Sequence, residues 1–250
     1  MSRTEPHARG ATIREVERLF EDAIDSAERL IYVETQYFSS KRIFEALAHR
    51  MRDAQRSRLQ IVLIVNERAE AIKEEIAVGL RQIQNIETLR RIAAETGHAL
   101  GCYYTLPAGA TDAEPEATYI HSKVMLVDDR FLTVGSANLT NRSMGIDSEL
   151  HASWEAETGD GPLRRRIRRV RVSLLAEHAG VAGRADLRAL CSVDGLVDRL
   201  DAIAARPGTR LRCHRGGTAI ERGLLQVIDP KALPFDSDGR SAAETHDNAA

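Results

Sequence analysis

The chain has 250 residues, a formal net charge of −2 and a hydrophobic content of 43%. These values predict a globular protein of one large or two small domains, and they exclude an overall positive field that would draw the chain to nucleic acid or anionic lipid. The three cysteines form no C-x-x-C pair, so we expect free, buried thiols in a reducing compartment. The sequence contains no apolar run of membrane-spanning length and no signal core, so we expect a cytoplasmic protein.

Helical and strand patterns alternate through the first part of the chain. Residues 1–11 are expected to be flexible. Thr12, with Glu15 three residues later, predicts a capping box that starts a helix with an apolar stripe to Ala27. The elements predicted after it are a strand over 30–33, a helix capped by Ser39 or Ser40 and reaching Met51, a strand over 59–65, a helix over 80–94 and a strand over 100–106.

The second part begins with a loop over 107–118. Strands are predicted over 120–127, 131–134 and 149–154, with Asp128-Asp129-Arg130 as a hairpin turn. Helices over 163–177 and 185–204 follow a Gly- and Pro-rich break, and the polar residues 236–250 are expected to be disordered. Such alternation predicts an α/β fold, in which helices flank both faces of a layered mixed β-sheet. We expect a single domain over 12–235, mainly helical from about residue 162.

A polar motif occurs once in the chain. Residues 121–138 contain H-x-K, then four residues, D, six residues and G-S-x-N. If 120–127 is a strand, His121 and Lys123 project from the same face. A neutral histidine can attack phosphorus, and a lysine can offset charge on the non-bridging phosphate oxygens. The spacing therefore supplies a nucleophile and a phosphate clamp together.

The other motif residues have supporting functions. Ser136 and Asn138 can donate hydrogen bonds to phosphate oxygens or hold the histidine and the lysine, and Gly135 permits close approach of the backbone. Asp128 is a candidate catalytic residue by its place in the motif. Its odd spacing from Lys123 directs it to the other strand face, which favours a structural or hydrogen-bonding residue over a proton donor. The chemistry requires no metal or other cofactor, and the sequence shows no metal-ligand cluster.

The motif resembles the HKD signature of the phospholipase D superfamily. The resemblance extends to the C-terminal half of two-motif phospholipase D and cardiolipin synthase-like enzymes, and it covers most of residues 12–235. The flanking segments that carry it are 31–38 (I-Y-V-E-T-Q-Y-F), 119–120 (Y-I), 141–145 (N-R-S-M-G), 147–150 (D-S-E-L) and 227–230 (V-I-D-P).

The resemblance implies functions for further residues. Glu149 stands where the family places a carboxylate that supports the catalytic histidine. Gln36 either lines the substrate site or caps a helix, and Arg142 either steers phosphate or serves packing. The family mechanism uses two histidines, of which one forms a phosphohistidine while the other protonates the leaving alcohol. One motif per chain supplies only one, so a second copy about a two-fold axis or a partner half-domain is expected to provide the other.

Three functions remain open from the sequence. The flanking segments favour hydrolysis of phospholipids or phosphatidyl transfer, with peripheral contact to a membrane. One alternative is a metal-independent phosphodiesterase acting on nucleic acid, although nucleic acid is a less favoured partner than phospholipid. The other is an inactive orphan half-domain. The arginine-rich run over 164–171 either binds an anionic surface or pairs with nearby acids, and we favour pairing. Trp154 and the Tyr103-Tyr104 pair are interpreted as core or rim packing.

Overall fold

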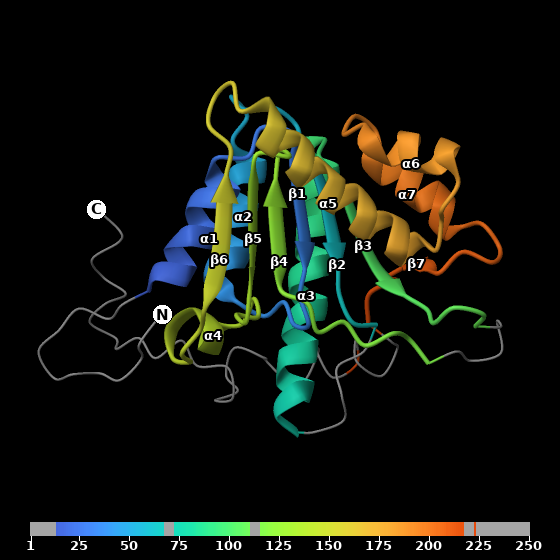
Figure 1. The fold of residues 1–250 in the computed structure, drawn as a ribbon. Coiled ribbons are helices and arrows are strands. Elements are labelled where there is room, and N and C mark those ends of the chain that lie inside the picture. The colour runs from blue at the N-terminus through green and yellow to red at the C-terminus, as the bar shows by residue number, and fades with distance from the viewer. Residues whose placement is uncertain (1–13, 68–72, 111–115, 218–222, 224–250) are drawn as a thin grey trace, which may run out of the picture.

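The structure is a computed structural model that describes residues 14–67, 73–110, 116–217 and 223 (Figure 1). The described helices are α1 (Glu15–Asp25), α2 (Lys41–Arg52), α3 (Lys73–Thr96), α4 (Asn141–Gly145), α5 (Gly161–Ala179), α6 (Arg184–Cys191) and α7 (Leu196–Ala204). The strands are β1 (Leu30–Glu34), β2 (Gln60–Ile64), β3 (Ala99–Thr105), β4 (Val124–Val127), β5 (Phe131–Gly135), β6 (His151–Glu155) and β7 (Leu211–Cys213).

One mixed sheet organises the molecule. Its strand order is β6-β5-β4-β1-β2-β3-β7. The three strands β1, β2 and β3 pair in parallel, because α2 and α3 carry the chain back between them, and every other pairing is antiparallel. The predicted mixed α/β sheet is therefore confirmed.

Helices cover both faces of this sheet (Figure 1). The central strand β1 shows why, since all five of its residues are buried. Ile31 and Val33 pack in a core with α1, α2 and α3, whereas Leu30 and Tyr32 pack in a second core with α5, α6 and α7. Successive side chains of a strand point to opposite faces, so an unbroken aliphatic run satisfies two helical layers at once.

The predicted helix caps and the predicted burial of the cysteines are confirmed only in part. Ser40 caps α2 by accepting a hydrogen bond from the Ile43 backbone N–H at 3.3 Å, as expected. Thr12 lies outside the described residues, and the described part of the first helix has Arg14 at its N-cap position. All three cysteines are free, but only Cys102 is buried, so the expectation of buried thiols is wrong for Cys191 and Cys213.

Several predicted boundaries are wrong. The strand expected over 120–127 begins only at Val124, and the one expected from Glu149 begins at His151. The helix expected over 185–204 is two helices, because the chain turns between them and Gly195 adopts a left-handed φ of 64°. Strand β7 was not predicted, since three residues are too few to show an alternating pattern.

Parts of the prediction lie outside the description. The expected flexible N-terminus, the segment 227–230 and the polar tail 236–250 are not among the described residues. Among those that are described, no helix combines the length and the apolar character needed to cross a membrane.

Candidate active site

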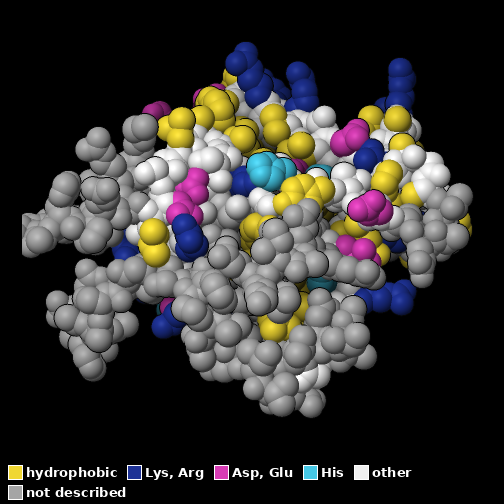
Figure 2. Space-filling view, turned by 90° about the horizontal axis from the view of Figure 1, so that it is seen from below, with side chains coloured by type: hydrophobic (Ala, Val, Ile, Leu, Met, Phe, Trp, Pro, Cys, Tyr) yellow, Lys and Arg dark blue, Asp and Glu magenta, His cyan; other side chains and the backbone are white. Residues whose placement is uncertain are grey.

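The motif lies at one end of the sheet, which we call the motif end. There β1, β2, β3 and β5 finish, while β4 and β6 begin. Figure 2 looks onto this end and shows a histidine side chain exposed near its middle, with a lysine or arginine beside it. The carboxyl ends of parallel strands are where open α/β sheets usually bind ligands.

Lys123 is the centre of the polar cluster at this end. Its side chain is largely buried, and Nζ donates hydrogen bonds to Gln36 Oε1 at 3.1 Å and to the His121 carbonyl oxygen at 2.7 Å. Asn138 Nδ2 donates to the same Gln36 oxygen at 3.4 Å. Gln36 thus joins the two motif residues, which supports its place in the site over the helix-capping alternative.

Glu149 acts on Lys123 by charge. Burial lowers the pKa of Lys123, and the nearby Glu149 carboxylate opposes that shift by favouring the ammonium form. Glu149 also accepts a hydrogen bond from the Ser136 hydroxyl, which in turn accepts one from the Leu150 backbone N–H at 3.1 Å. Glu149 therefore lies near the lysine, and Ser136 holds Glu149 rather than Lys123 or His121.

The His121 ring is exposed at the surface of this end. It stacks against the ring of Tyr119, with centroids 6.1 Å apart and planes at 24°, and Tyr119 accepts a hydrogen bond from Gln36 Nε2. The expected pairing of His121 with Glu149 is wrong. Among the described residues Glu149 accepts its hydrogen bond from Ser136, and no hydrogen bond joins it to the histidine.

Asn66 holds the backbone just before the motif, so that His121 and Lys123 lie ahead of β4 rather than within it. Its Oδ1 accepts from the Ile120 backbone N–H at 2.6 Å, while Nδ2 donates to the carbonyl oxygens of Ile120 and Gln36, both at 3.3 Å. This side chain takes the backbone groups of residue 120 that a strand ladder would use. Asn66 was missed by sequence reasoning, although a polar residue directly after a buried strand was an available signal.

A second polar cluster lies behind the motif, on the side of the sheet that α5 covers. Buried Glu34 accepts hydrogen bonds from the Ser122 and Tyr32 hydroxyls and pairs with His178 Nε2 at 3.1 Å. His178 Nδ1 contacts the Thr105 hydroxyl at 2.9 Å. Burial would raise the pKa of Glu34, but the hydrogen bond and charge of His178, with the two hydroxyls, lower it. Because Ser122 separates His121 from Lys123, this cluster anchors the motif backbone.

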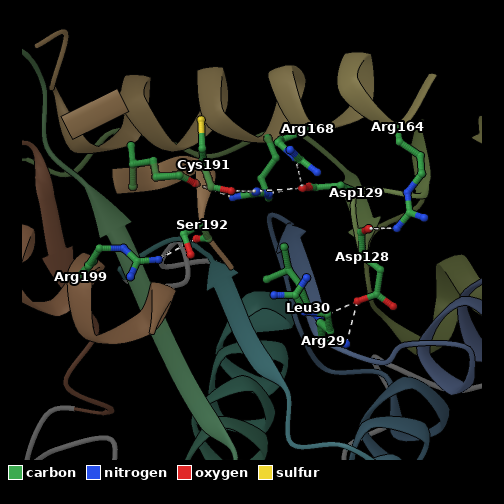
Figure 3. A network of polar contacts seen from close by, with 11 residues as sticks. Arg29, Leu30, Asp128, Asp129, Arg164, Arg168, Cys191, Ser192 and Arg199 are labelled. Atoms are coloured by element: carbon green, nitrogen blue, oxygen red, sulfur yellow. Dashed lines mark hydrogen bonds and ion pairs between the residues drawn. The ribbon is translucent and has the colours of Figure 1, made fainter. Parts of the chain in front are cut away.

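Asp128 lies at the opposite end of the sheet, so its assignment as a catalytic residue is wrong. Its carboxylate accepts hydrogen bonds from the backbone N–H groups of Arg29 at 2.8 Å and Leu30 at 2.7 Å (Figure 3). It also accepts one from the backbone N–H of Glu28 at 2.7 Å. Asp128 and Asp129 both adopt left-handed φ angles, 55° and 52°, which confirms the predicted hairpin turn. The structural interpretation of Asp128 is therefore supported.

The arginine run is also structural where its contacts are described. Arg171 is fully buried and binds both carboxylate oxygens of Asp129, at 2.7 and 3.0 Å, and Arg168 binds the same carboxylate at 2.9 Å (Figure 3). Arg164 donates to the Asp128 carbonyl oxygen. The favoured interpretation, pairing with nearby acids, is supported for Arg168 and Arg171, whereas the described contact of Arg164 is to a backbone oxygen.

Two predicted substrate-binding residues have structural contacts. A Cβ on Gly135 would collide with the Leu150 carbonyl and the His151 ring, so the close approach at this glycine is to the neighbouring strand. Arg142 forms an exposed ion pair with Asp147, Nη2 to Oδ1, at 2.9 Å. Among the residues the structure describes, no group of acids, histidines and cysteines has the arrangement of a metal site.

Comparisons with known proteins agree with the motif. A family model described as "Cardiolipin synthase, PLD-like domain" matches residues 20–169. A phospholipase D of Phytophthora infestans is 27% identical over 209 residues, covering 67% of this chain and 12% of that protein. Phospholipase D gamma 2 of Arabidopsis thaliana is 45% identical over 71 residues, covering 25% of this chain and 8% of that protein. The chain thus spans only a small part of these relatives' length.

Solved structures of low identity are also similar to this chain. Nuc of Salmonella typhimurium, a phospholipase D family member, is 18% identical with a TM-score of 0.41, over 62% of this chain and 84% of that one. Phosphatidylserine synthase of Haemophilus influenzae is 15% identical with a TM-score of 0.45, over 76% of this chain and 42% of that one.

Proposed function

Because the chain belongs to the cardiolipin synthase, PLD-like domain family of the phospholipase D superfamily, whose members are phosphodiesterases and transferases, we propose that it cleaves the phosphodiester bond of phospholipids. The products form by hydrolysis or by phosphatidyl transfer to an alcohol. The observation that supports this most is the convergence of Lys123, Gln36 and Asn138 beside the exposed ring of His121.

In this mechanism a His121 ring nitrogen attacks phosphorus. The new N–P bond forms as the P–O bond to the leaving alcohol breaks, and a proton from a second histidine neutralises the departing alkoxide. Water or an alcohol then attacks the phosphohistidine, loses its proton to the same second histidine and releases His121. The stacked Tyr119 ring limits the orientations that His121 can adopt before the attack.

Lys123 is suited to hold the phosphate. An ammonium group has three N–H donors, and among the described residues Nζ uses two of them, on Gln36 and on the His121 carbonyl. The third is directed to a non-bridging phosphate oxygen as negative charge develops there. Glu149 and Ser136 are positioning residues in this proposal, because the Glu149 charge acts on Lys123 and Ser136 holds Glu149.

The second histidine comes from a second motif. One motif supplies one nucleophile, and a two-fold axis passing near His121 would bring the same residue of a second copy to the opposite side of the phosphate. A partner half-domain with its own motif would serve in the same way.

The test is release of choline from phosphatidylcholine by the purified protein without added metal. We expect activity in the wild type and its loss in His121→Ala and Lys123→Met, with unchanged far-UV circular dichroism. Plasmid DNA is the second substrate. Nicking that depends on His121, without choline release, would show that the substrate is nucleic acid rather than phospholipid. Inactivity of a verified dimer on both substrates would defeat the proposal.

A further inference from the structure

The outward face of α5 carries a row of exposed arginines. Ile167 and Arg171 point to the sheet and are buried, whereas Arg165, Arg166 and Arg169 turn away from it and are exposed. Within the part of the chain that the structure describes, these three form no ion pair. We call them the α5 arginine row. Figure 2 shows Lys and Arg side chains that project from this side of the molecule.

The neighbouring part of the sheet lacks a helical cover on the same side. Figure 1 shows α5 crossing the upper part of this face, while β6 and the lower part of β5 lie bare among the described elements. Cross-strand partners share a face, and Leu132 of the core under α5 pairs with Trp154, as Val134 pairs with Ala152. These side chains therefore face the side of the sheet that α5 covers.

The side chains on this bare face are apolar and exposed. Leu150 is 66% exposed, Trp154 46% and Val134 41%. We call Val134, Leu150, Ala152 and Trp154 the β5–β6 patch. A contiguous group of exposed apolar side chains on a globular protein usually marks a docking surface.

The arginine row and the patch adjoin each other. Arg164 of α5 and Glu155, which follows Trp154 in β6, line one surface hollow. Val170 is exposed beside Arg169 on the outward side of α5, so an apolar side chain stands next to the arginine row as well. The cationic and the apolar side chains therefore belong to one surface.

The acids at this border leave the arginines with an excess of positive charge. Glu155 pairs with Arg130 at 2.8 Å, and Asp160 caps α5 by accepting a hydrogen bond from the Leu163 backbone N–H at 3.0 Å. Glu157 is a further carboxylate of the hollow, and the arginine row outnumbers it. An anionic partner gains from this balance.

We propose that the α5 arginine row and the β5–β6 patch form one surface that docks on an anionic membrane. Arginines at a bilayer surface pair with anionic headgroups, while tryptophan and aliphatic side chains enter the boundary between headgroups and acyl chains. The exposed leucine and valines favour a lipid surface over nucleic acid, whose affinity comes from phosphate contacts and base stacking. A second copy docked through the same surface would bring two arginine rows of like charge together, which repulsion opposes.

The docked orientation places the motif end at the edge of the bilayer. The Leu150 backbone N–H donates a hydrogen bond to the Ser136 hydroxyl at 3.1 Å, and Ser136 holds Glu149, whose charge acts on Lys123. The apolar part of the surface therefore lies next to the residues that would bind phosphate. The inference goes beyond the proposed function, because binding to a bilayer requires no chemistry at His121.

Trp154 reports the docking directly, because it is the only tryptophan in the sequence. The experiment titrates the full-length chain with vesicles of phosphatidylcholine alone and with vesicles that also contain phosphatidylglycerol. It follows the emission maximum of Trp154 and the sedimentation of the protein with the vesicles. On the anionic vesicles we expect a blue shift and sedimentation with the same midpoint, as the indole leaves water. Both should weaken as salt is added, because salt screens the arginines, and phosphatidylcholine alone should bind far less.

Two matched triple variants test the arginine row. The first replaces its three residues by glutamine. The second makes the same replacement at three exposed arginines of α1, α2 and the loop before β2, namely Arg18, Arg52 and Arg58. An arginine near an anionic bilayer strengthens binding about fivefold, so the first variant should need about a hundredfold more anionic lipid for half-maximal binding. The second should bind like the wild type, and equal losses in the two variants would overturn the inference.

A second pair of variants tests the patch. Ala152→Asp places a negative charge in the β5–β6 patch, and Ala94→Asp places the same charge on an exposed alanine of α3. We expect the first to weaken binding to the anionic vesicles at least about tenfold, since the carboxylate meets both headgroup charge and the acyl boundary, and the second to leave it unchanged. Wild-type binding by Ala152→Asp, with unchanged circular dichroism, would remove the patch from the docking surface and overturn the inference.

Other outcomes overturn the docking or separate it from the chemistry. A blue shift that follows protein concentration without vesicles would assign the patch to a second copy. One induced by single-stranded DNA but not by anionic vesicles would assign the surface to nucleic acid. Blue-shifted emission without any addition, at the mass of one chain, would show that the chain itself covers the patch. Choline release measured on the same samples distinguishes the two proposals: vesicle-bound but inactive protein defeats only the proposed reaction, and active protein that does not bind anionic vesicles defeats the docking.

Discussion

Replacing Asp128 separates a structural function from a catalytic one. The aspartate of the motif lies at the end of the sheet away from Lys123, where its carboxylate accepts three backbone N–H groups that begin β1. Asp128→Ala removes all three acceptors and places alanine at a left-handed φ of 55°. Asp128→Asn keeps one acceptor oxygen and a side chain that tolerates this conformation.

The magnitude follows from these contacts. A hydrogen bond to a charged group contributes about 1.5–3 kcal/mol, but the bonds to Glu28 and Arg29 are exposed and contribute less. The left-handed conformation costs alanine about 1 kcal/mol. We expect Asp128→Ala to lower the free energy of unfolding by about 3–4 kcal/mol and Asp128→Asn to lower it by about 1–2 kcal/mol.

The assay is urea unfolding followed by circular dichroism, with choline release measured on the same protein well below the unfolding transition. The folded fraction of each variant should retain the wild-type kcat. Wild-type stability combined with loss of turnover in Asp128→Asn would refute the reasoning and return Asp128 to the chemistry.

Three further predictions concern the motif end. Gln36→Leu removes the acceptor shared by Lys123 and Asn138, so choline release should fall about tenfold to a hundredfold in kcat/KM with unchanged stability; a wild-type rate would contradict the placement of Lys123 by Gln36. His178→Gln removes the hydrogen bond and charge that lower the pKa of Glu34. The acid limb of the plot of kcat against pH should therefore move to higher pH, with little change in KM. An unmoved limb would show that Glu34 does not act on the motif. Burial lowers the pKa of His151 to about 4, so between about pH 6.5 and 4 the unfolded chain binds more protons than the folded one. The free energy of unfolding should therefore fall by about 2 kcal/mol as the pH is lowered through that window. Urea midpoints that fall equally in His151→Gln would contradict this.

The layers of the fold could be predicted because each strand carries its own pattern. The aliphatic run 59–65 indicated a strand buried on both faces, and its residues enter both cores. Trp154 shows the limit of such patterns. A tryptophan in a strand is usually packed, but Trp154 is 46% exposed, because no described helix covers its face of β6.

From spacing alone, the site could be predicted only where its residues are close in sequence, and Gln36 was found through the family resemblance. His121, Lys123 and Asn138 were found from their spacing, and Lys123 meets Asn138 through Gln36. The error at Asp128 was avoidable, because five residues of extended chain after Lys123 span about 16 Å. His178 lies on a distant helix, and only the packing of α5 against the sheet brings it to Glu34.

The central claim is that His121 attacks phosphorus while Lys123 holds the phosphate. The most direct measurement is mass spectrometry of the protein after brief incubation with phosphatidylcholine and an alkaline quench. We predict a phosphatidyl adduct on the peptide that contains His121 in the wild type, and its absence in Lys123→Met. Rapid choline release with an unmodified His121, or an adduct on another residue, would contradict the account.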